Sequence, residues 1–447
     1  MASLLILNAN LVNEGNITPS DVYINNQRIE VIGADLAHLT ADHIIDAAGR
    51  FLMPGMIDSH VHFREPGLTY KGTLASESRA AIAGGITSIL DMPNTVPYVL
   101  TTEDIVGKKV LAQGQSWANY AFYLGASNDN LEAIKALDPH IACGIKVLTG
   151  TPGKDQIWVD DPERLTQIFQ HAPLLVAMHC EDMPTILENE ESYRSIYGDA
   201  IPMELHPLIR SEEACYKSSA MVVELARSLS TRLHILQLST ASELELFDKG
   251  LVRDKLITAD TCAHYAFFSE QDYTLRSSLL KCDPAIKTAA DRAALIQGLL
   301  DNSIDIVSSG HAPHTLAEKH EASYFNIPSG FPSVQHTLPS LFEGFHDGLF
   351  SLECIADKTS HAVAQLFQIK ERGFIREGYW ADLILVDIGK SWVAQHDNSF
   401  YKCGWTAHYG MEFRTTIDAT IVSGQLVWFE GQFMSTAAPG LALEFDR

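Results

Sequence analysis

Two histidines one residue apart, His60 and His62, end the apolar segment 51–62 and constrain the fold more than any other feature of the chain. In a β-strand the side chains alternate between two faces, so both imidazoles would point to the same side. Turn-forming residues stand at 54–55, near the start of the strand, and at 64–67, directly after the second histidine. An isolated His-x-His is more often a hydrogen-bonded pair near a turn. With turns on both sides, the pair instead indicates a divalent metal site at a strand end.

Short apolar strands alternate with helical segments through the middle of the chain. The predicted strands are 53–62, 86–92, 118–124, 142–148, 174–179, 232–238, 256–260 and 304–309. Predicted helices include 73–83, 161–170, 212–228 and 289–300. Alternation of this kind predicts an α/β fold with a (β/α)8 TIM-type barrel, in which chemistry lies at the carboxyl ends of the strands.

Both ends of the chain are rich in β patterns. Strands are predicted at 4–8, 21–24, 28–32, 381–387, 416–422 and 426–429, with a hairpin turn at Asn25-Asn26. Neither end has enough strands to close a core. We therefore predict that residues 1–52 and 375–447 form one composite β-sandwich domain and that residues 53–374 form the barrel.

The composition excludes some classes of partner. Lys and Arg number 32 against 56 Asp and Glu, a net charge of −24, which disfavours nucleic acid and anionic membranes. The first residues contain no basic leader, and no stretch approaches the ~20 apolar residues that span a bilayer. The 7 cysteines are scattered, so we expect reduced thiols and a cytoplasmic protein. Cys180 follows a candidate ligand, but a small buried thiol is the commoner role.

Polar residues follow the predicted strands in barrel order. Each alone is a weak signal, because a histidine at a strand end is usually just hydrogen-bonded. Together they indicate one site at the barrel mouth. They are His60, His62, Asn94, Lys146, His179, Gln237 and His264, and the end of the last strand carries Gly310 in place of a polar residue.

Five motifs resemble those of dihydroorotases in the amidohydrolase superfamily. They are His-Val-His-Phe-Arg-Glu-Pro-Gly at 60–67, Asp-Met-Pro-Asn at 91–94, Gly-Ile-Lys at 144–146, Arg-Leu-His-Ile-Leu at 232–236 and His-Ala-Pro-His at 311–314. The resemblance runs from Leu5 to about Trp428. Allantoinases and hydantoinases share the architecture but match these loops less well. The resemblance implies reversible interconversion of N-carbamoyl-L-aspartate and dihydroorotate in pyrimidine biosynthesis, with one or two zinc ions.

The resemblance also implies a role for each metal-site residue. His60 and His62 would hold the first metal ion and His179 the second. Lys146 would react with carbon dioxide to form a carbamate that bridges the two ions. That reaction needs a neutral amine, which burial and a neighbouring metal ion can provide by lowering the pKa of the lysine.

Three further residues would bind the carboxylate of a small-molecule substrate. The resemblance assigns this role to Arg64, Asn94 and His314, and a guanidinium offers a carboxylate a bidentate fork. The alternative is a role in loop structure, with Arg64 pairing with a nearby acid and Asn94 making a turn. Relatives also lead us to expect a homodimer.

Two positions depart from the family pattern in the catalytic centre. Gln237 replaces a histidine that binds the second metal ion, and Gly310 replaces an aspartate that binds the first and carries the proton. A positioned acid or base contributes about 10²- to 10⁴-fold to the rate. Tyr265 replaces a histidine, and Asp283 replaces an asparagine, adding a carboxylate that would repel an acidic substrate unless it is protonated or paired.

Three functions remain open from the sequence. The first is a dihydroorotase-type enzyme with an impaired metal site and proton shuttle. The second is a non-catalytic dihydroorotase-like scaffold, for example a partner of aspartate transcarbamoylase, as occurs among relatives. The third is a hydrolase of another cyclic amide such as allantoin or a hydantoin, which Asp283 and Phe331 favour.

Overall fold

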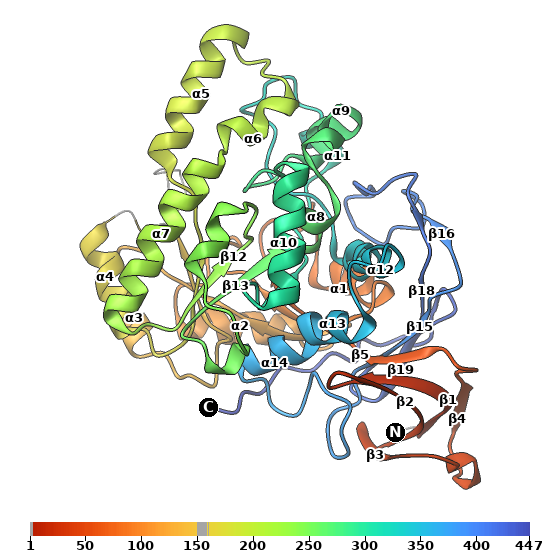
Figure 1. The fold of residues 1–447 in the computed structure, drawn as a ribbon. Coiled ribbons are helices and arrows are strands. Elements are labelled where there is room, and N and C mark those ends of the chain that lie inside the picture. The colour runs from red at the N-terminus through yellow and green to blue at the C-terminus, as the bar shows by residue number, and fades with distance from the viewer. Residues whose placement is uncertain (1–2, 150–158, 160) are drawn as a thin grey trace.

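The computed structural model describes residues 3–149, 159 and 161–447, and its central feature is a barrel of parallel strands (Figure 1). The strands β6, β7 and β8 pair in that order, and β9 to β14 continue the circuit. A parallel bridge between Val61 and His311 returns the last strand to the first. The predicted (β/α)8 barrel is confirmed. β8 and β9 are two parts of one barrel strand, interrupted at residue 123, which pair with β7 and β10 respectively. The strands are β6 Met56–Val61, β7 Ile86–Asp91, β8 Asn119–Phe122, β9 Leu124–Gly125, β10 Ile145–Leu148, β11 Val176–His179, β12 Leu233–Leu236, β13 Ile257–Cys262 and β14 Ile306–Ser308.

Helices alternate with these strands, as predicted. The four helices predicted by residue range begin at, or one residue after, the expected position, because polar side chains cap them. Thr73, Asp161, Ser211 and Thr288 each accept a hydrogen bond from a backbone N–H of the first turn. The helices are α1 Leu74–Ala83, α2 Thr102–Ala112, α3 Leu131–Lys135, α4 Pro162–His171, α5 Met183–Tyr197, α6 His206–Ile209, α7 Glu212–Leu229, α8 Ala263–Phe267, α9 Tyr273–Arg276, α10 Ala289–Asp301, α11 Leu316–Lys319, α12 Thr337–His346, α13 Leu352–Ala356 and α14 Ala362–Phe367.

Strands from both ends of the chain form one sheet, in the order β20-β19-β18-β15-β5-β1-β2-β3, with β4 paired to β1. Its apolar side chains make a core of their own, separate from the barrel core. The predicted composite sandwich is confirmed, and the boundaries at 52 and 374 stay predictions. The strands are β1 Leu4–Asn13, β2 Asn16–Asn25, β3 Arg28–Gly33, β4 His43–Asp46, β5 Phe51–Pro54, β15 Leu383–Asp387, β18 Thr416–Val422, β19 Gln425–Phe429 and β20 Gln432–Phe433; β16 Trp392–Val393 pairs with β17 Glu412–Phe413.

Two local predictions need correction. The hairpin turn lies at Asn26 and Gln27, one residue later than expected, and both have positive φ. The single strand predicted for 53–62 is two strands divided at Gly55, with β5 in the sandwich sheet and β6 in the barrel. A Cβ at Gly55 would lie 2.1 Å from Cγ2 of Thr87, so the chain crosses between the two units at a residue without a side chain.

A buried carboxylate joins the sandwich sheet to the barrel. Asp382 pairs with Arg372, and its Oδ1 accepts hydrogen bonds from Nδ2 of Asn119, at 3.0 Å, and from the backbone N–H of Ser423, at 2.7 Å. Asn119 begins the barrel strand β8, whereas Ser423 follows β18 of the terminal sheet. All four residues are buried, so the carboxylate is satisfied from both units at once.

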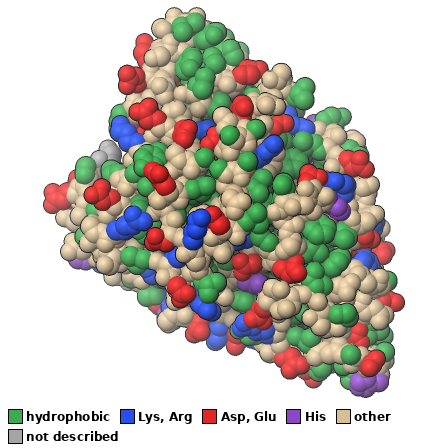
Figure 2. All heavy atoms as spheres, viewed as in Figure 1, with side chains coloured by type: hydrophobic (Ala, Val, Ile, Leu, Met, Phe, Trp, Pro, Cys, Tyr) green, Lys and Arg blue, Asp and Glu red, His purple; other side chains and the backbone are tan. Residues whose placement is uncertain are grey.

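The surface and the thiols agree with the composition. Figure 2 shows Asp and Glu side chains spread over one face, with Lys and Arg side chains interspersed among them. All seven cysteines are free. Cys180 is buried, and burial raises the pKa of its thiol to about 12, which argues against a nucleophile. None of the helices within the described residues is both long and apolar enough to cross a membrane.

Candidate active site

A cavity of about 450 Å³ opens at the carboxyl ends of the barrel strands. Its volume suits a small-molecule ligand. All the strand-end residues that the sequence singled out contribute to its lining. They are His60, His62, Asn94, Lys146, His179, Gln237, His264 and Gly310.

His60 and His62 lie side by side on this cavity, with ring centroids 5.3 Å apart. Burial lowers the pKa of both imidazoles well below the ordinary value, so both rings are neutral at neutral pH. Nδ1 of His62 lies 2.7 Å from Oδ1 of Asn94, which fixes the orientation of the ring. Neutral imidazole is the form that binds metal ions.

Lys146 is a buried residue of β10 and lines the same cavity. Burial lowers the pKa of its amine to about 7. About half of the molecules therefore carry the neutral amine at neutral pH, which is the form that reacts with carbon dioxide.

The reactivity of Lys146 is expected to rise as pH increases from 6 to 8. Because the pKa is lowered, the amine loses its proton through this range, whereas an ordinary lysine stays charged up to about pH 10.4. Competitive labelling with cyanate, read by peptide mass spectrometry, should give a midpoint near 7 for Lys146. The exposed Lys249 serves as the internal control and should show no such midpoint. A midpoint above 9 for Lys146 would contradict the prediction.

His179, the predicted ligand of a second metal ion, has contacts at both ring nitrogens. Nδ1 lies 3.2 Å from Oε1 of Gln237, and Nε2 lies 2.8 Å from Oε2 of Glu181. Gln237 in turn donates from Nε2 to Sγ of Cys262, at 3.6 Å. The glutamine thus links His179 to Cys262 at the end of β13.

Gly310 occupies a crowded position. Its φ is +60°, and a Cβ there would lie 2.7 Å from Sγ of Cys262, 3.0 Å from Nε2 of Gln237 and 3.2 Å from Cε1 of His264. Neighbouring side chains therefore fill the space in which the family has an aspartate.

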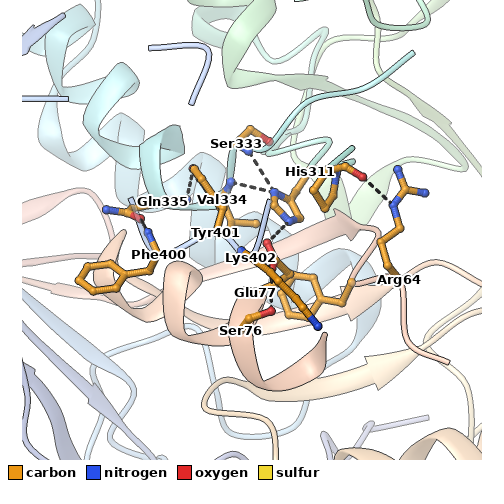
Figure 3. A network of polar contacts seen from close by, with 12 residues as sticks. Arg64, Ser76, Glu77, His311, Ser333, Val334, Gln335, Phe400, Tyr401 and Lys402 are labelled. Atoms are coloured by element: carbon orange, nitrogen blue, oxygen red, sulfur yellow. Dashed lines mark hydrogen bonds and ion pairs between the residues drawn. The ribbon is translucent and has the colours of Figure 1, made fainter. Parts of the chain in front are cut away.

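The neighbouring His311 does not replace that aspartate. Figure 3 shows its ring directed toward Glu77 and Ser333. Nε2 lies 3.0 Å from Oε2 of Glu77, and Nδ1 accepts a hydrogen bond from the backbone N–H of Ser333 at 3.0 Å. Both nitrogens are thus engaged away from the cavity.

Two of the three residues predicted to bind a carboxylate lie behind the cavity wall. Asn94 is on the lining, but Arg64 and His314 are not among the described lining residues. Nε of Arg64 donates to the carbonyl of Pro313 at 3.1 Å, and its Nη2 lies 3.1 Å from Nε2 of His314. That nitrogen also lies 3.1 Å from the carbonyl of Ser329, which does line the cavity.

A charged wall, made of Glu181, Arg210 and Asp283, closes another side of the cavity. Nη1 of Arg210 lies 2.7 Å from Oε2 of Glu181, and Nε lies 2.8 Å from Oδ1 of Asp283. The added carboxylate at 283 is thus paired. Sequence reasoning missed Arg210, because it lies on the segment after α6 and has no motif of its own.

The described side chains do not fit a two-ion centre. No three His, Cys, Asp or Glu side chains in the described part of the chain lie together as a metal-binding group. A single ion would need His60, His62 and a carbamate on Lys146, since neither Gln237 nor Gly310 supplies the missing imidazole or carboxylate.

Comparison with known proteins agrees with this architecture. The sequence profile of the amidohydrolase family matches residues 51–427. The chain is 29% identical to an allantoinase of Desulfitobacterium hafniense, over 97% of this chain and 96% of that protein. It is also 29% identical to a dihydroorotase of Methanosarcina acetivorans, over 99% and 96%. A dihydroorotase of Halobacterium salinarum is 30% identical, over 91% and 93%.

Solved structures show the same fold. The L-hydantoinase (dihydropyrimidinase) of Arthrobacter aurescens superimposes with a TM-score of 0.93, covering 99% of this chain and 100% of that chain, at 23% identity. Dihydropyrimidinase from Brevibacillus agri gives a TM-score of 0.89 at 22% identity. At such identity the likeness concerns the fold alone.

Proposed function

This chain belongs to the amidohydrolase family, and from that premise we propose that it binds dihydroorotate and N-carbamoyl-L-aspartate at the barrel mouth and interconverts them slowly. Such chemistry is the hydrolysis of a cyclic amide and its reversal. Relatives named dihydroorotase and allantoinase are about equally similar, so the choice of substrate depends on the site.

The observation that favours an acidic ligand is the charge balance beside Asn94. Arg64 is buried, and burial lowers its pKa to about 10, yet it forms no ion pair within the described part of the chain. Lys71 contacts His314 at 2.8 Å and is paired with Glu318. Glu318 is thus the one carboxylate in ion-pair contact with this pair of cations among the described residues, and Asp91 and Glu77 act on Arg64 from farther away. A buried guanidinium without a carboxylate in contact is costly, so an anionic ligand would be attracted to this side of the cavity.

The catalytic power of the site is expected to be low. A metal ion bound by His60, His62 and carbamylated Lys146 would polarise the amide carbonyl as a Lewis acid. At position 310 there is no group to carry a proton, and His311 faces away. Loss of such a group typically costs about 10²- to 10⁴-fold in rate.

Removing the imidazole pair is expected to abolish the remaining turnover. Protein supplied with zinc and bicarbonate would be assayed for N-carbamoyl-L-aspartate cyclisation beside His60→Ala/His62→Ala, with metal content measured by elemental analysis. The double variant should bind no zinc and should have an activity at least tenfold lower than that of wild type. Equal rates in the two proteins would contradict the proposed enzyme. Hydrolysis of allantoin or hydantoin in place of cyclisation would change the substrate and leave the site assignment standing.

A second candidate is a non-catalytic scaffold, for example a partner of aspartate transcarbamoylase, with the chain as a homodimer. The poor fit to a two-ion centre and the occupied nitrogens of His179 favour it. Co-purification with a transcarbamoylase whose stability depends on this chain would support it. Robust turnover by the isolated protein would exclude it.

A further inference from the structure

The charged wall has features that its role as a salt bridge leaves unexplained. Oε1 of Glu181 is buried and accepts no hydrogen bond in the described part of the chain. Nη2 of Arg210 likewise donates to none of the described residues, whereas Nη1 and Nε hold the two carboxylates. Both residues line the cavity and are joined through the other atoms of their side chains, Nη1 and Oε2.

An unsatisfied buried carboxylate oxygen is costly to a folded protein unless a ligand or a water molecule donates to it. Arg210 lies 2.7 Å from Oε2 of Glu181 and 2.8 Å from Oδ1 of Asp283. Arg210 lowers the pKa of Asp283 against the effect of burial. The wall therefore holds two carboxylates beside one guanidinium, and a further anion at that place would be repelled.

We infer that Arg210 and Glu181 bind the amide edge of the cyclic ligand, Arg210 donating to its carbonyl oxygen and Glu181 accepting from its ring N–H. This inference rests on the proposed function. A ring holds its amide cis, so the N–H and C=O point to the same side and match a carboxylate placed beside a guanidinium. Asp283 acts as a positioning residue that holds Arg210.

The assignment also orients the ligand. Arg64 follows β6 and Asn94 follows β7, whereas Glu181 follows β11, farther around the barrel. A ring carboxylate is repelled by the charged wall and attracted by Arg64, which has no carboxylate in ion-pair contact among the described residues. The carboxylate and the amide edge of one ring would thus contact separate sides of the cavity.

Binding measurements on the intact protein test the inference. Dihydroorotate and its N3-methyl derivative, which lacks the N–H between the two ring carbonyls, would be titrated by calorimetry into wild type, Arg210→Met, Arg210→Lys and Arg194→Met. Arg194 is the matched control, because it also pairs with an acid, Asp199 at 2.8 Å, but lies outside the cavity. A charge-assisted hydrogen bond predicts about 10- to 100-fold weaker binding of the methylated ligand to wild type.

The variants test whether this difference between the two ligands depends on Arg210. Arg210→Met is expected to bind both ligands equally weakly, Arg210→Lys to recover part of the difference, and Arg194→Met to match wild type. The comparison of the two ligands on wild type stands even if Arg210→Met fails to fold. Equal binding of both ligands to wild type, or equal binding of dihydroorotate by Arg210→Met and Arg194→Met, would overturn the inference.

A third ligand separates this inference from the proposed function. Dihydrouracil keeps the amide edge but lacks the carboxylate. If wild type does not bind dihydroorotate but binds dihydrouracil in an Arg210-dependent way, the proposed function fails and the inference stands. If wild type binds neither ring, both fail.

Discussion

A triple variant with Gly310→Asp, Gln237→His and Cys262→Ala is expected to cyclise N-carbamoyl-L-aspartate about 10²- to 10⁴-fold faster than wild type. The first two changes restore the proton carrier and the imidazole that the family has at these positions. The third is required by the structure, because a Cβ at residue 310 would lie 2.7 Å from Sγ of Cys262. Initial rates with saturating zinc, normalised to bound metal, would measure the gain.

The single change Gly310→Asp is expected to lower the free energy of unfolding, for two separable reasons. A non-glycine residue at φ +60° costs about 1–2 kcal/mol, and crowding adds about 1–3 kcal/mol to the loss in the free energy of unfolding. Gly348, after the end of α12, has φ +73° and no atom within 4 Å of an added Cβ, so Gly348→Asp isolates the backbone cost. If Gly310→Asp is no less stable than Gly348→Asp, crowding by Cys262 is not the obstacle. If the triple variant is as slow as wild type, the cause of low activity lies elsewhere.

Replacing Asp382 by alanine is expected to lower the free energy of unfolding by about 3–5 kcal/mol. The change leaves the buried guanidinium of Arg372 unpaired and removes the acceptor for Asn119 and Ser423. Because these partners belong to both the barrel and the terminal sheet, urea denaturation should also become less cooperative.

Glu371→Ala provides the control for this substitution. Glu371 pairs with Arg28, but both side chains are more than a third exposed, at 38% and 34%. Exposed pairs of this kind contribute about 0–1 kcal/mol. A similar loss in both variants would show that the Asp382 contact does not join the two units.

Local patterns were sufficient to predict the barrel and its helix starts. Short apolar strands and side chains such as Thr73 and Thr288 at helix N-caps depend on neighbouring residues, which a sequence shows directly. The strand break at Gly55 was missed because its cause is Thr87, in the next strand of the barrel. Apolar character continues through the break, so periodicity gives no sign of it.

The distinction between features set by neighbouring residues and features set by distant residues also holds at the site. Strand ends predicted the residues that line the cavity, since a parallel barrel gathers them at one end. The charged wall depends on Arg210, which reaches the cavity from outside any strand end. The positions of Arg64 and His314 behind the lining depend on loop conformation, with Arg64 at a φ of 67°. Neither feature leaves a pattern in the neighbouring residues.

The terminal sheet also sets an order of events during synthesis. Strand β5, at Phe51–Pro54, cannot pair with β15 until Leu383–Asp387 has left the ribosome. At ordinary rates of translation that wait lasts tens of seconds. For this time the free edge of β5 is open to pairing with other chains, a period in which a chaperone would have most to protect.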